Sequence, residues 1–143
     1  MAQTGHARWE GDLKNGRGTI ALGSGAFEGP YSFKSRFEGA PGTTPEELLG
    51  AAHAGCFTMA LSLGLATAGH PATSLDTTAS VTLAKVGDAF AITRIDLSLK
   101  GIVAGISEAD FKRLAEDAKK NCIISRAISA VPMTLDATLL AAV

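Results

Sequence analysis

Two cysteines are the most reactive groups that this sequence offers. Cys56 lies in the middle of the apolar run TTPEELLGAAHAGCFTMALSLGLATAG (43–69), and Cys122 lies in the last quarter of the chain. A thiol becomes a nucleophile as the thiolate, and a sulfenic acid formed on it condenses with a second thiol to a disulfide. Two cysteines in different elements could therefore act as nucleophile and resolving thiol if the fold brings them together.

Each cysteine taken alone is also explained by packing. Free cysteine is among the most buried residue types and behaves as a small hydrophobe, so spacing alone favours this interpretation for Cys56 and for Cys122. A reactive Cys56 needs a nearby positive charge, because the middle of a helix offers no favourable dipole. His53, three residues earlier, is the candidate within the helix. A partly buried, hydrogen-bonded side chain explains that histidine better.

Arg36, in KSRFEG, is the stronger source of positive charge. Guanidinium is always charged, and its planar fork can hold a carboxylate and a second anion, although a solvated strand arginine explains Arg36 alone more simply. Glu46 and Glu47 are adjacent acids at a predicted helix start. Thr44 and Glu47 match a capping box, which gives Glu47 a structural role and leaves Glu46 free for another.

Two kinds of element must position Arg36 and Cys56. The runs HARWEGD, GTIAL and AFEGPYSFKSRFEG are strand-like and are separated by turn residues, which predicts a small antiparallel sheet in the first forty residues. A helix is predicted from Pro45 to about Ala68, where Gly69 stops it. Because this helix is apolar nearly all round, we expect it to be buried between a sheet and a second copy of the chain.

The second half of the chain predicts a hairpin, helices and a strand. LDTTASVTLAKV and FAITRIDLSLKGIV alternate and meet at Gly87-Asp88. SEADFKRLAEDAKKNC is amphipathic with Ser107 as its cap, and Cys122 lies on its buried stripe or just past its end. SRAISA predicts a short helix and MTLDATLLA a last strand. The element order predicts one α+β domain over residues 1–143 rather than a doubly wound parallel sheet.

Length and charge narrow the class of protein. The chain of 143 residues is too short to predict two domains, and its net charge of -1 gives no attraction to nucleic acid or to an anionic membrane. The N-terminus lacks the pattern of a signal peptide, and polar residues interrupt the longest apolar stretch. We therefore expect no membrane span and a cytoplasmic location. No ligand spacing indicates a metal site, and we expect no metal or cofactor.

Four segments resemble the OsmC/Ohr family of thiol-dependent peroxidases: RFEG (36–39), TTPEELLGAAHAGCFTMALS (43–62), LDTTASVTL (75–83) and FAITRIDL (90–97). The similarity extends over essentially the whole chain, and RFEG and AAHAGCFTMALS are more similar to the OsmC branch than to the Ohr branch. The resemblance implies an OsmC-like α+β fold, with antiparallel sheets packed around a long buried central helix. It also implies an intertwined two-fold dimer with sites at the interface.

The resemblance also implies a role for each candidate residue. Cys56 corresponds to the peroxidatic cysteine, Cys122 to the resolving cysteine, Arg36 to the arginine that activates the thiolate, and Glu46 to the glutamate that orients this arginine. Ile123 stands where the family commonly has proline.

The activity implied is antioxidant reduction of organic hydroperoxides, weaker on hydrogen peroxide, in an oxidative stress response. It passes through a Cys56 sulfenic acid and a Cys56–Cys122 disulfide, which an external dithiol of lipoyl type reduces.

Two alternatives remain open at this point. Cys56 and His53 could serve a Cys-His hydrolase or acyl transferase, which would tolerate loss of Cys122. The chain could also be a redox-responsive, ligand-binding dimer whose cysteines only pack. One distance bears on assembly: ten helical residues separate Glu46 from Cys56 by about 15 Å, so a second chain could complete the site.

Overall fold

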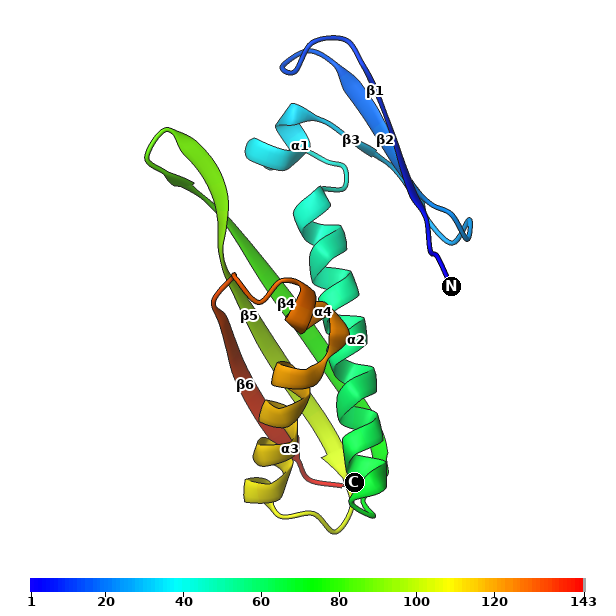
Figure 1. The fold of residues 1–143 in the computed structure, drawn as a ribbon, viewed down its shortest axis with the longest axis vertical. Helices are drawn as coiled ribbons and strands as arrows, with labels where there is room; N and C mark the ends of the chain where they lie inside the picture. Colours follow the sequence, from blue (N-terminus) through cyan, green and yellow to red (C-terminus); the bar gives the residue numbers. More distant parts are fainter. Residues whose placement is uncertain (143) are drawn as a thin grey trace. The chain divides into compact units, whose positions relative to one another are not determined.

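A computed structural model describes residues 1–142 of the chain. Contacts divide it into two compact units, Met1–Leu48 and Leu49–Val143, and each is described by itself below. Figure 1 shows the order of the elements along the chain. Mixed strands and helices confirm the predicted α+β class.

The first unit contains the predicted antiparallel sheet. Strands β1 (Gly5–Glu10), β2 (Arg17–Leu22) and β3 (Glu28–Tyr31) pair in the order β1-β2-β3, drawn in blue in Figure 1.

A short helix, α1 (Phe33–Phe37), follows β3 where the sequence predicted a continuing strand, and that prediction was wrong. Ser32 and Ser35 form a capping box in which each hydroxyl accepts from the other residue's backbone N–H, at 3.0 and 2.9 Å. This local exchange starts a helix that the alternating pattern conceals. Arg36 therefore lies on a helix.

Helix α2 (Pro45–Thr67) has the predicted length and ends. The Thr44 hydroxyl accepts from the Glu47 backbone N–H at 3.0 Å, as expected of a cap. The Glu47 carboxylate accepts from the Thr43 hydroxyl at 2.8 Å, so Glu47 does have a structural role. A capping box would instead pair this carboxylate with Thr44, one residue later. Gly69, with φ of 86°, follows the last turn in the left-handed region that favours glycine.

The second unit is built on a mixed sheet of order β4-β5-β6. Strands β4 (Ala72–Val86) and β5 (Ala89–Val103) form the predicted hairpin around Gly87-Asp88. Strand β6 (Met133–Leu140) pairs with β5 in parallel, although the resemblance implied antiparallel sheets. The intervening helices return the chain along the sheet, and such a crossover makes the next strand parallel.

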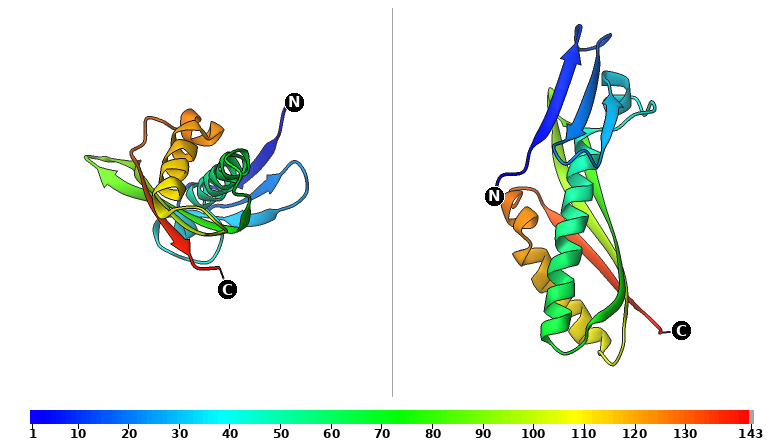
Figure 2. Two further views of the ribbon diagram at one scale, coloured as in Figure 1. Left: turned by 90° about the horizontal axis from the view of Figure 1, so that it is seen from below. Right: turned by 90° about the vertical axis from the view of Figure 1, so that its right-hand side faces the viewer.

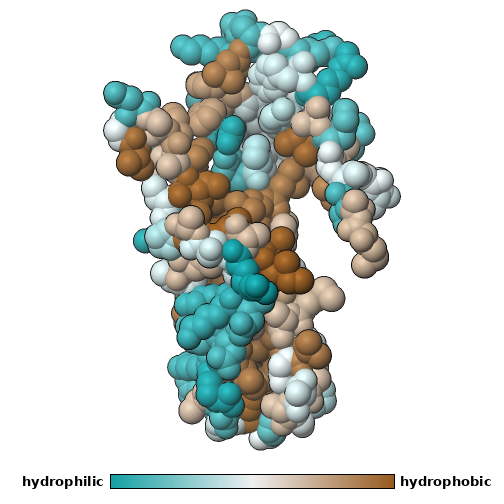
Figure 3. All heavy atoms as spheres, in the orientation of Figure 1, coloured by the Kyte–Doolittle hydropathy of each residue, from teal (hydrophilic) through white to brown (hydrophobic). Residues whose placement is uncertain are grey.

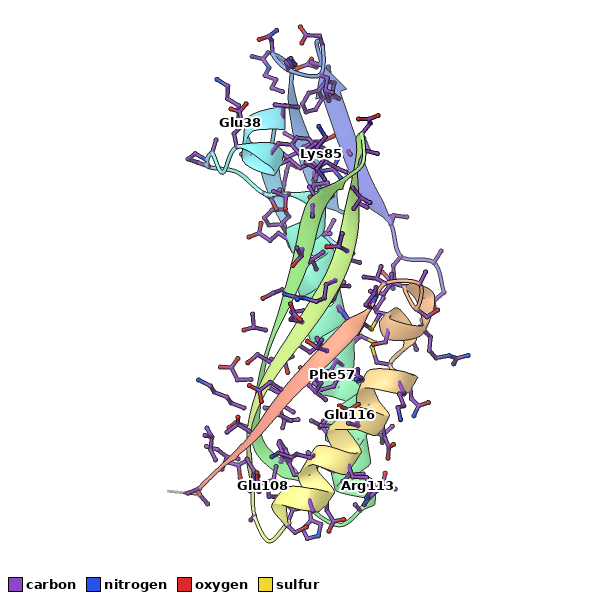
Figure 4. All side chains as sticks on the ribbon, turned by 90° about the vertical axis from the view of Figure 1, so that its left-hand side faces the viewer. Glu38, Phe57, Lys85, Glu108, Arg113 and Glu116 are labelled. Carbon is purple, nitrogen blue, oxygen red and sulfur yellow. The ribbon has the colours of Figure 1, made fainter. Side chains whose placement is uncertain are left out.

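Helices α2, α3 (Glu108–Asn121) and α4 (Ile123–Ala127) lie on one face of this sheet (Figure 2). Figure 4 shows Phe57 in the layer between the helices and the sheet, and Glu108, Arg113 and Glu116 along α3. The shared core contains the buried side chains Phe57, Leu61, Leu65, Leu97, Leu99, Val103, Phe111 and Ala115. It gives α2 and α3 a fixed position over the strands.

One face of α2 is uncovered in the single chain. The helix is long and apolar enough to cross a membrane by length and composition, contrary to our expectation, and only 28% of its apolar window is buried. Met59 and Leu63 are 77% and 70% exposed. Figure 3 shows hydrophobic colouring along α2 beside the hydrophilic outer face of α3. Phe57, Leu61 and Leu65 enter the shared core, so the opposite face of α2 is packed within the second unit.

Candidate functional site

The two cysteines meet at the point where α4 begins. Both are free thiols; Cys122 is buried and Cys56 is half-buried. Cys122 ends α3 by donating its N–H to the Ala118 carbonyl at 2.9 Å, and its sulfur accepts from the Ser125 N–H at 3.3 Å at the start of α4. The two thiols are near enough to shift each other's pKa. Figure 4 shows sulfur atoms, in yellow, where α4 faces α2.

The first turn of α4 also contacts Cys56. The Ile124 N–H donates to Cys56 Sγ at 3.5 Å. The side chain of Ile123 is 75% exposed, whereas its backbone N–H is one of the groups that lower the pKa of Cys56. Both sulfurs therefore receive backbone N–H groups from one short turn.

The pKa values of the two thiols shift in opposite directions. Burial raises the pKa of Cys56 and the neighbouring Cys122 raises it further, while the N–H groups of Ile124 and Ile123 offset part of the increase. Burial also raises the pKa of Cys122, but hydrogen bonds from Cys56 and Ser125 outweigh this effect and lower it overall. The raised pKa of Cys56 disfavours its thiolate. A reactive Cys56 requires an additional cation.

His53 contacts Ser125 rather than a cysteine. It is fully buried, and its Nε2 lies 2.7 Å from Ser125 Oγ. Among the residues that the structure describes, its Nδ1 has no hydrogen-bond partner. Burial lowers the pKa of His53, which keeps the ring neutral at pH 7. Neither ring nitrogen bonds to Cys56, so the geometry gives no support to a Cys-His hydrolase.

Ser125 is the site residue that sequence reasoning missed. It lies 72 positions from its partner His53, a separation at which no local pattern operates. One sequence signal could have found it. Ser125 lies three residues after Cys122, and at this position the backbone N–H donates to the side chain of an N-cap residue.

Arg36 and Glu46 form the predicted ion pair within the first unit. Arg36 Nε donates to Glu46 Oε1 and Oε2 at 3.0 and 3.2 Å, and Nη2 donates to Oε1 at 2.6 Å. The Glu46 side chain is 9% exposed and that of Arg36 39%. A buried carboxylate with a two-nitrogen contact fixes the plane of the guanidinium. Its remaining N–H groups can donate to another anion.

A cavity of about 240 Å³ adjoins Arg36 in the first unit. Its lining is largely aromatic and apolar: Trp9, Leu13, Tyr31, Phe33 and Phe37. Such a cavity suits an alkyl or aryl group next to a cation. Within residues 1–142, no cluster of three or more potential metal ligands is found.

Comparison with known proteins gives consistent matches. The family model described as OsmC-like protein matches residues 37–136. Peroxiredoxin OsmC of Escherichia coli (strain K12) is 51% identical over 133 residues, 92% of each chain, and the values for Peroxiredoxin OsmC of Shigella flexneri are the same.

Two solved structures share the fold. The organic hydroperoxide resistance protein OhrB of Bacillus subtilis has a TM-score of 0.69 and 21% identity, over 96% of this chain and 98% of that one. The OsmC-like protein from Mycoplasma pneumoniae has a TM-score of 0.70 and 17% identity, over 98% of both chains.

Proposed function

This chain belongs to the OsmC family and is a peroxidase, and we propose that it reduces organic hydroperoxides at Cys56. The observation that carries the proposal is that two free thiols meet at the start of α4, where the Ile124 N–H donates to Cys56 Sγ and the Ser125 N–H donates to Cys122 Sγ. Known proteins support the substrate class, since OhrB of Bacillus subtilis, which shares the fold, is described as an organic hydroperoxide resistance protein. A peroxidase activity argues against the non-enzymatic alternative of a dimer with merely packed cysteines.

The reaction uses both sulfurs in turn. The Cys56 thiolate attacks the terminal oxygen of R–O–OH and breaks the O–O bond. This leaves Cys56 as a sulfenic acid, and the alkoxide takes up a proton and departs as the alcohol. Cys122 then attacks the Cys56 sulfur, which forms the disulfide and releases the hydroxyl oxygen as water. An external dithiol, which we propose to be of lipoyl type, reduces the disulfide by exchange.

Arg36 and Glu46 supply the charge that Cys56 lacks. Because burial raises the pKa of Cys56, a guanidinium beside it is needed to favour the thiolate, and the same group can donate to the departing oxygen. Glu46 keeps that guanidinium in one orientation. The aromatic cavity beside Arg36 supports a preference for organic hydroperoxides over hydrogen peroxide. Hydrogen peroxide has no alkyl or aryl group that could bind to an apolar lining.

We further propose an intertwined two-fold homodimer built from one OsmC-like domain, residues 1–143. Helix α2 continues without a break across the boundary between the two units, which supports a single domain. The exposed side chains of Met59 and Leu63 form an apolar surface on α2, and α2 of a second copy presents the same surface. Two such surfaces can cover each other about a two-fold axis. Arg36 and Glu46 of one chain would then serve the cysteines of the other. Two free thiols suit a reducing compartment, and we propose the cytoplasm.

The test is reduction of an alkyl hydroperoxide with dihydrolipoamide, with hydrogen peroxide as the comparison substrate. We expect turnover to vanish in Cys56→Ser and Cys122→Ser and to fall sharply in Arg36→Ala. Arg17→Ala is the matched control, because Arg17 is an exposed arginine of the same unit. A wild type that consumes no peroxide with any dithiol would refute the proposal, as would full turnover by Cys56→Ser.

A further inference from the structure

The cavity beside Arg36 has two pairs of aromatic side chains in its wall. Trp9 and Tyr31 form one pair, with ring centroids 5.3 Å apart and ring planes at 60°. Phe33 and Phe37 form the other pair, with ring centroids 4.9 Å apart. The guanidinium of Arg36 lies over the Phe37 ring, 5.4 Å from its centroid. The cation therefore packs against the same wall that an organic group in the cavity would contact.

A glycine allows Trp9 and Tyr31 to meet. Gly18 on β2 lies between them, because it pairs with Trp9 on β1 and with Tyr31 on β3. A Cβ on Gly18 would clash with Tyr31 Cε1 and would lie 2.7 Å from Trp9 Cε3. The two rings thus occupy the space over β2 that a side chain would fill, and they pack edge to face.

The indole of Trp9 is also held from the turn between β1 and β2. Its Nε1–H donates to the Gly11 carbonyl at 3.1 Å. A Cβ on Gly16 would lie 2.8 Å from the same Nε1, so the turn approaches the indole closely. Trp9 cannot swing away from Tyr31 without breaking these contacts, and the cavity therefore has a rigid wall on this side.

We propose that Trp9 sets the size of the organic group, and that the substrates are hydroperoxides with a compact branched or aryl group rather than a long chain. This inference rests on the proposed function, in which Arg36 serves the reacting peroxide. The cavity of about 240 Å³ is smaller than the pockets of about 300–1,000 Å³ that hold drug-sized ligands. A tert-butyl or cumyl group suits such a space, whereas the chain of a fatty acid hydroperoxide extends beyond it. Trp9 contacts the organic group and takes no part in the chemistry.

The first test is a binding measurement that does not depend on the peroxidase reaction. Trp9 is the only tryptophan in the sequence, so its fluorescence reports on the cavity directly. The reduced wild type is titrated with cumyl alcohol, which has the organic group of cumene hydroperoxide and no O–O bond. We expect a saturable change in the tryptophan emission. Phe27→Ala is the matched control and should show the same change, because Phe27 is an aromatic residue of the same unit that packs over Gly29 and does not line the cavity.

The second test measures specificity in the variants Trp9→Phe, Trp9→Ala and Phe27→Ala. The readout is the ratio of kcat/KM for tert-butyl hydroperoxide to kcat/KM for linoleic acid hydroperoxide, in which a general loss of activity cancels. Wild type should favour tert-butyl hydroperoxide. Trp9→Ala removes contacts with the compact group and makes room for the chain, so the ratio should fall on the order of tenfold, as expected for a change in a hydrophobic pocket. Trp9→Phe should fall between, and Phe27→Ala should equal wild type.

Several results would overturn the inference. An unchanged ratio in both Trp9→Phe and Trp9→Ala, or an equal fall in Phe27→Ala, refutes the role of Trp9 while the peroxidase stands. A wild type that prefers linoleic acid hydroperoxide refutes the compact substrate class. A titration without any change in emission shows that the cavity does not bind the organic group.

Failure of the proposed function is distinguishable from these results. A wild type that consumes no peroxide refutes that function, and the titration with cumyl alcohol then still decides whether the cavity binds an organic group. Circular dichroism checks the fold of each variant. If Trp9→Ala does not fold, Trp9→Phe decides the question of size.

Discussion

At the scale of single residues, two adjacent glutamates at the start of α2 have different partners. Glu46 binds Arg36 through three contacts, and Glu47 accepts from the Thr43 hydroxyl. Glu46→Gln removes the charge that orients the guanidinium, and we expect peroxidase turnover to fall on the order of 10- to 100-fold, the cost of a misplaced catalytic group. Steady-state kinetics of the purified variant measures this loss.

Glu47→Gln is the matched control for that variant. It weakens a helix start, so it should lower the free energy of unfolding by about 1 kcal/mol and leave turnover near that of wild type. Denaturant unfolding together with the activity assay measures both effects. Equal activity losses in Glu46→Gln and Glu47→Gln would contradict the assigned roles.

His53 gives the folded protein a specific pH dependence. Burial lowers its pKa below the usual 6.5, so below pH 6.5 the unfolded chain binds a proton that the folded chain does not. The free energy of unfolding should therefore fall as pH drops from 6.5 toward the lowered pKa of His53 in the folded protein. Above pH 6.5 the stability that comes from a neutral, buried His53 is fully present. Urea unfolding of wild type and His53→Gln at about pH 7 and about pH 5 tests it. The stability difference between the two proteins should change with pH, and a constant difference would be the contrary result.

Sequence reasoning found the residues whose signals are local or whose family pattern is specific. The ion pair of Arg36 with Glu46 and the meeting of Cys56 with Cys122 match what the resemblance implied. The N–H groups that donate to the two sulfurs were not predicted. Those donors come from the fold around α4, and a linear pattern does not contain them.

At the scale of elements, α4 shows what the residue after Cys122 contributes. Ile123 is the first residue of the helix, a position that tolerates proline, and Cys122 has φ of -56° and ψ of 135°, which suits a residue before proline. Proline has no N–H, and the N–H of Ile123 lowers the pKa of Cys56. Ile123→Pro should therefore raise that pKa and slow alkylation of Cys56 at neutral pH.

Iodoacetamide labelling in a Cys122→Ser background measures this effect, because Cys56 is then the only thiol. Ile123→Ala is the control, since it removes the exposed side chain and keeps the N–H. Equal labelling rates in Ile123→Pro and Ile123→Ala would show that this donor has no influence on Cys56.

Elements with local start and stop signals were predicted well. The cap at Thr44, the stop at Gly69 and the turn at Gly87-Asp88 all act over a few residues, and the structure has each where the sequence indicated. Two features were missed for opposite reasons. Helix α1 was concealed by an alternating pattern, and the parallel direction of β6 depends on a pairing with β5 that no segment of the chain specifies alone.

At the scale of the whole molecule, the uncovered face of α2 predicts assembly. If two copies of α2 cover each other, Met59→Glu combined with Leu63→Glu should place charges in the interface and convert a dimer to a monomer, with loss of activity. Light scattering coupled to size exclusion measures the mass. Lys112→Gln, on the exposed face of α3, should leave the dimer intact. A double variant that remains dimeric and active would show that α2 is not the interface.

Mass spectrometry after one equivalent of cumene hydroperoxide shows whether Cys56 is oxidised by the hydroperoxide and Cys122 resolves it. We expect wild type to form a peptide cross-link between Cys56 and Cys122. We expect Cys122→Ser to gain one oxygen, captured by dimedone at Cys56. A wild type whose two thiols remain reduced, or a Cys122→Ser variant with oxygen only on other residues, would contradict these roles.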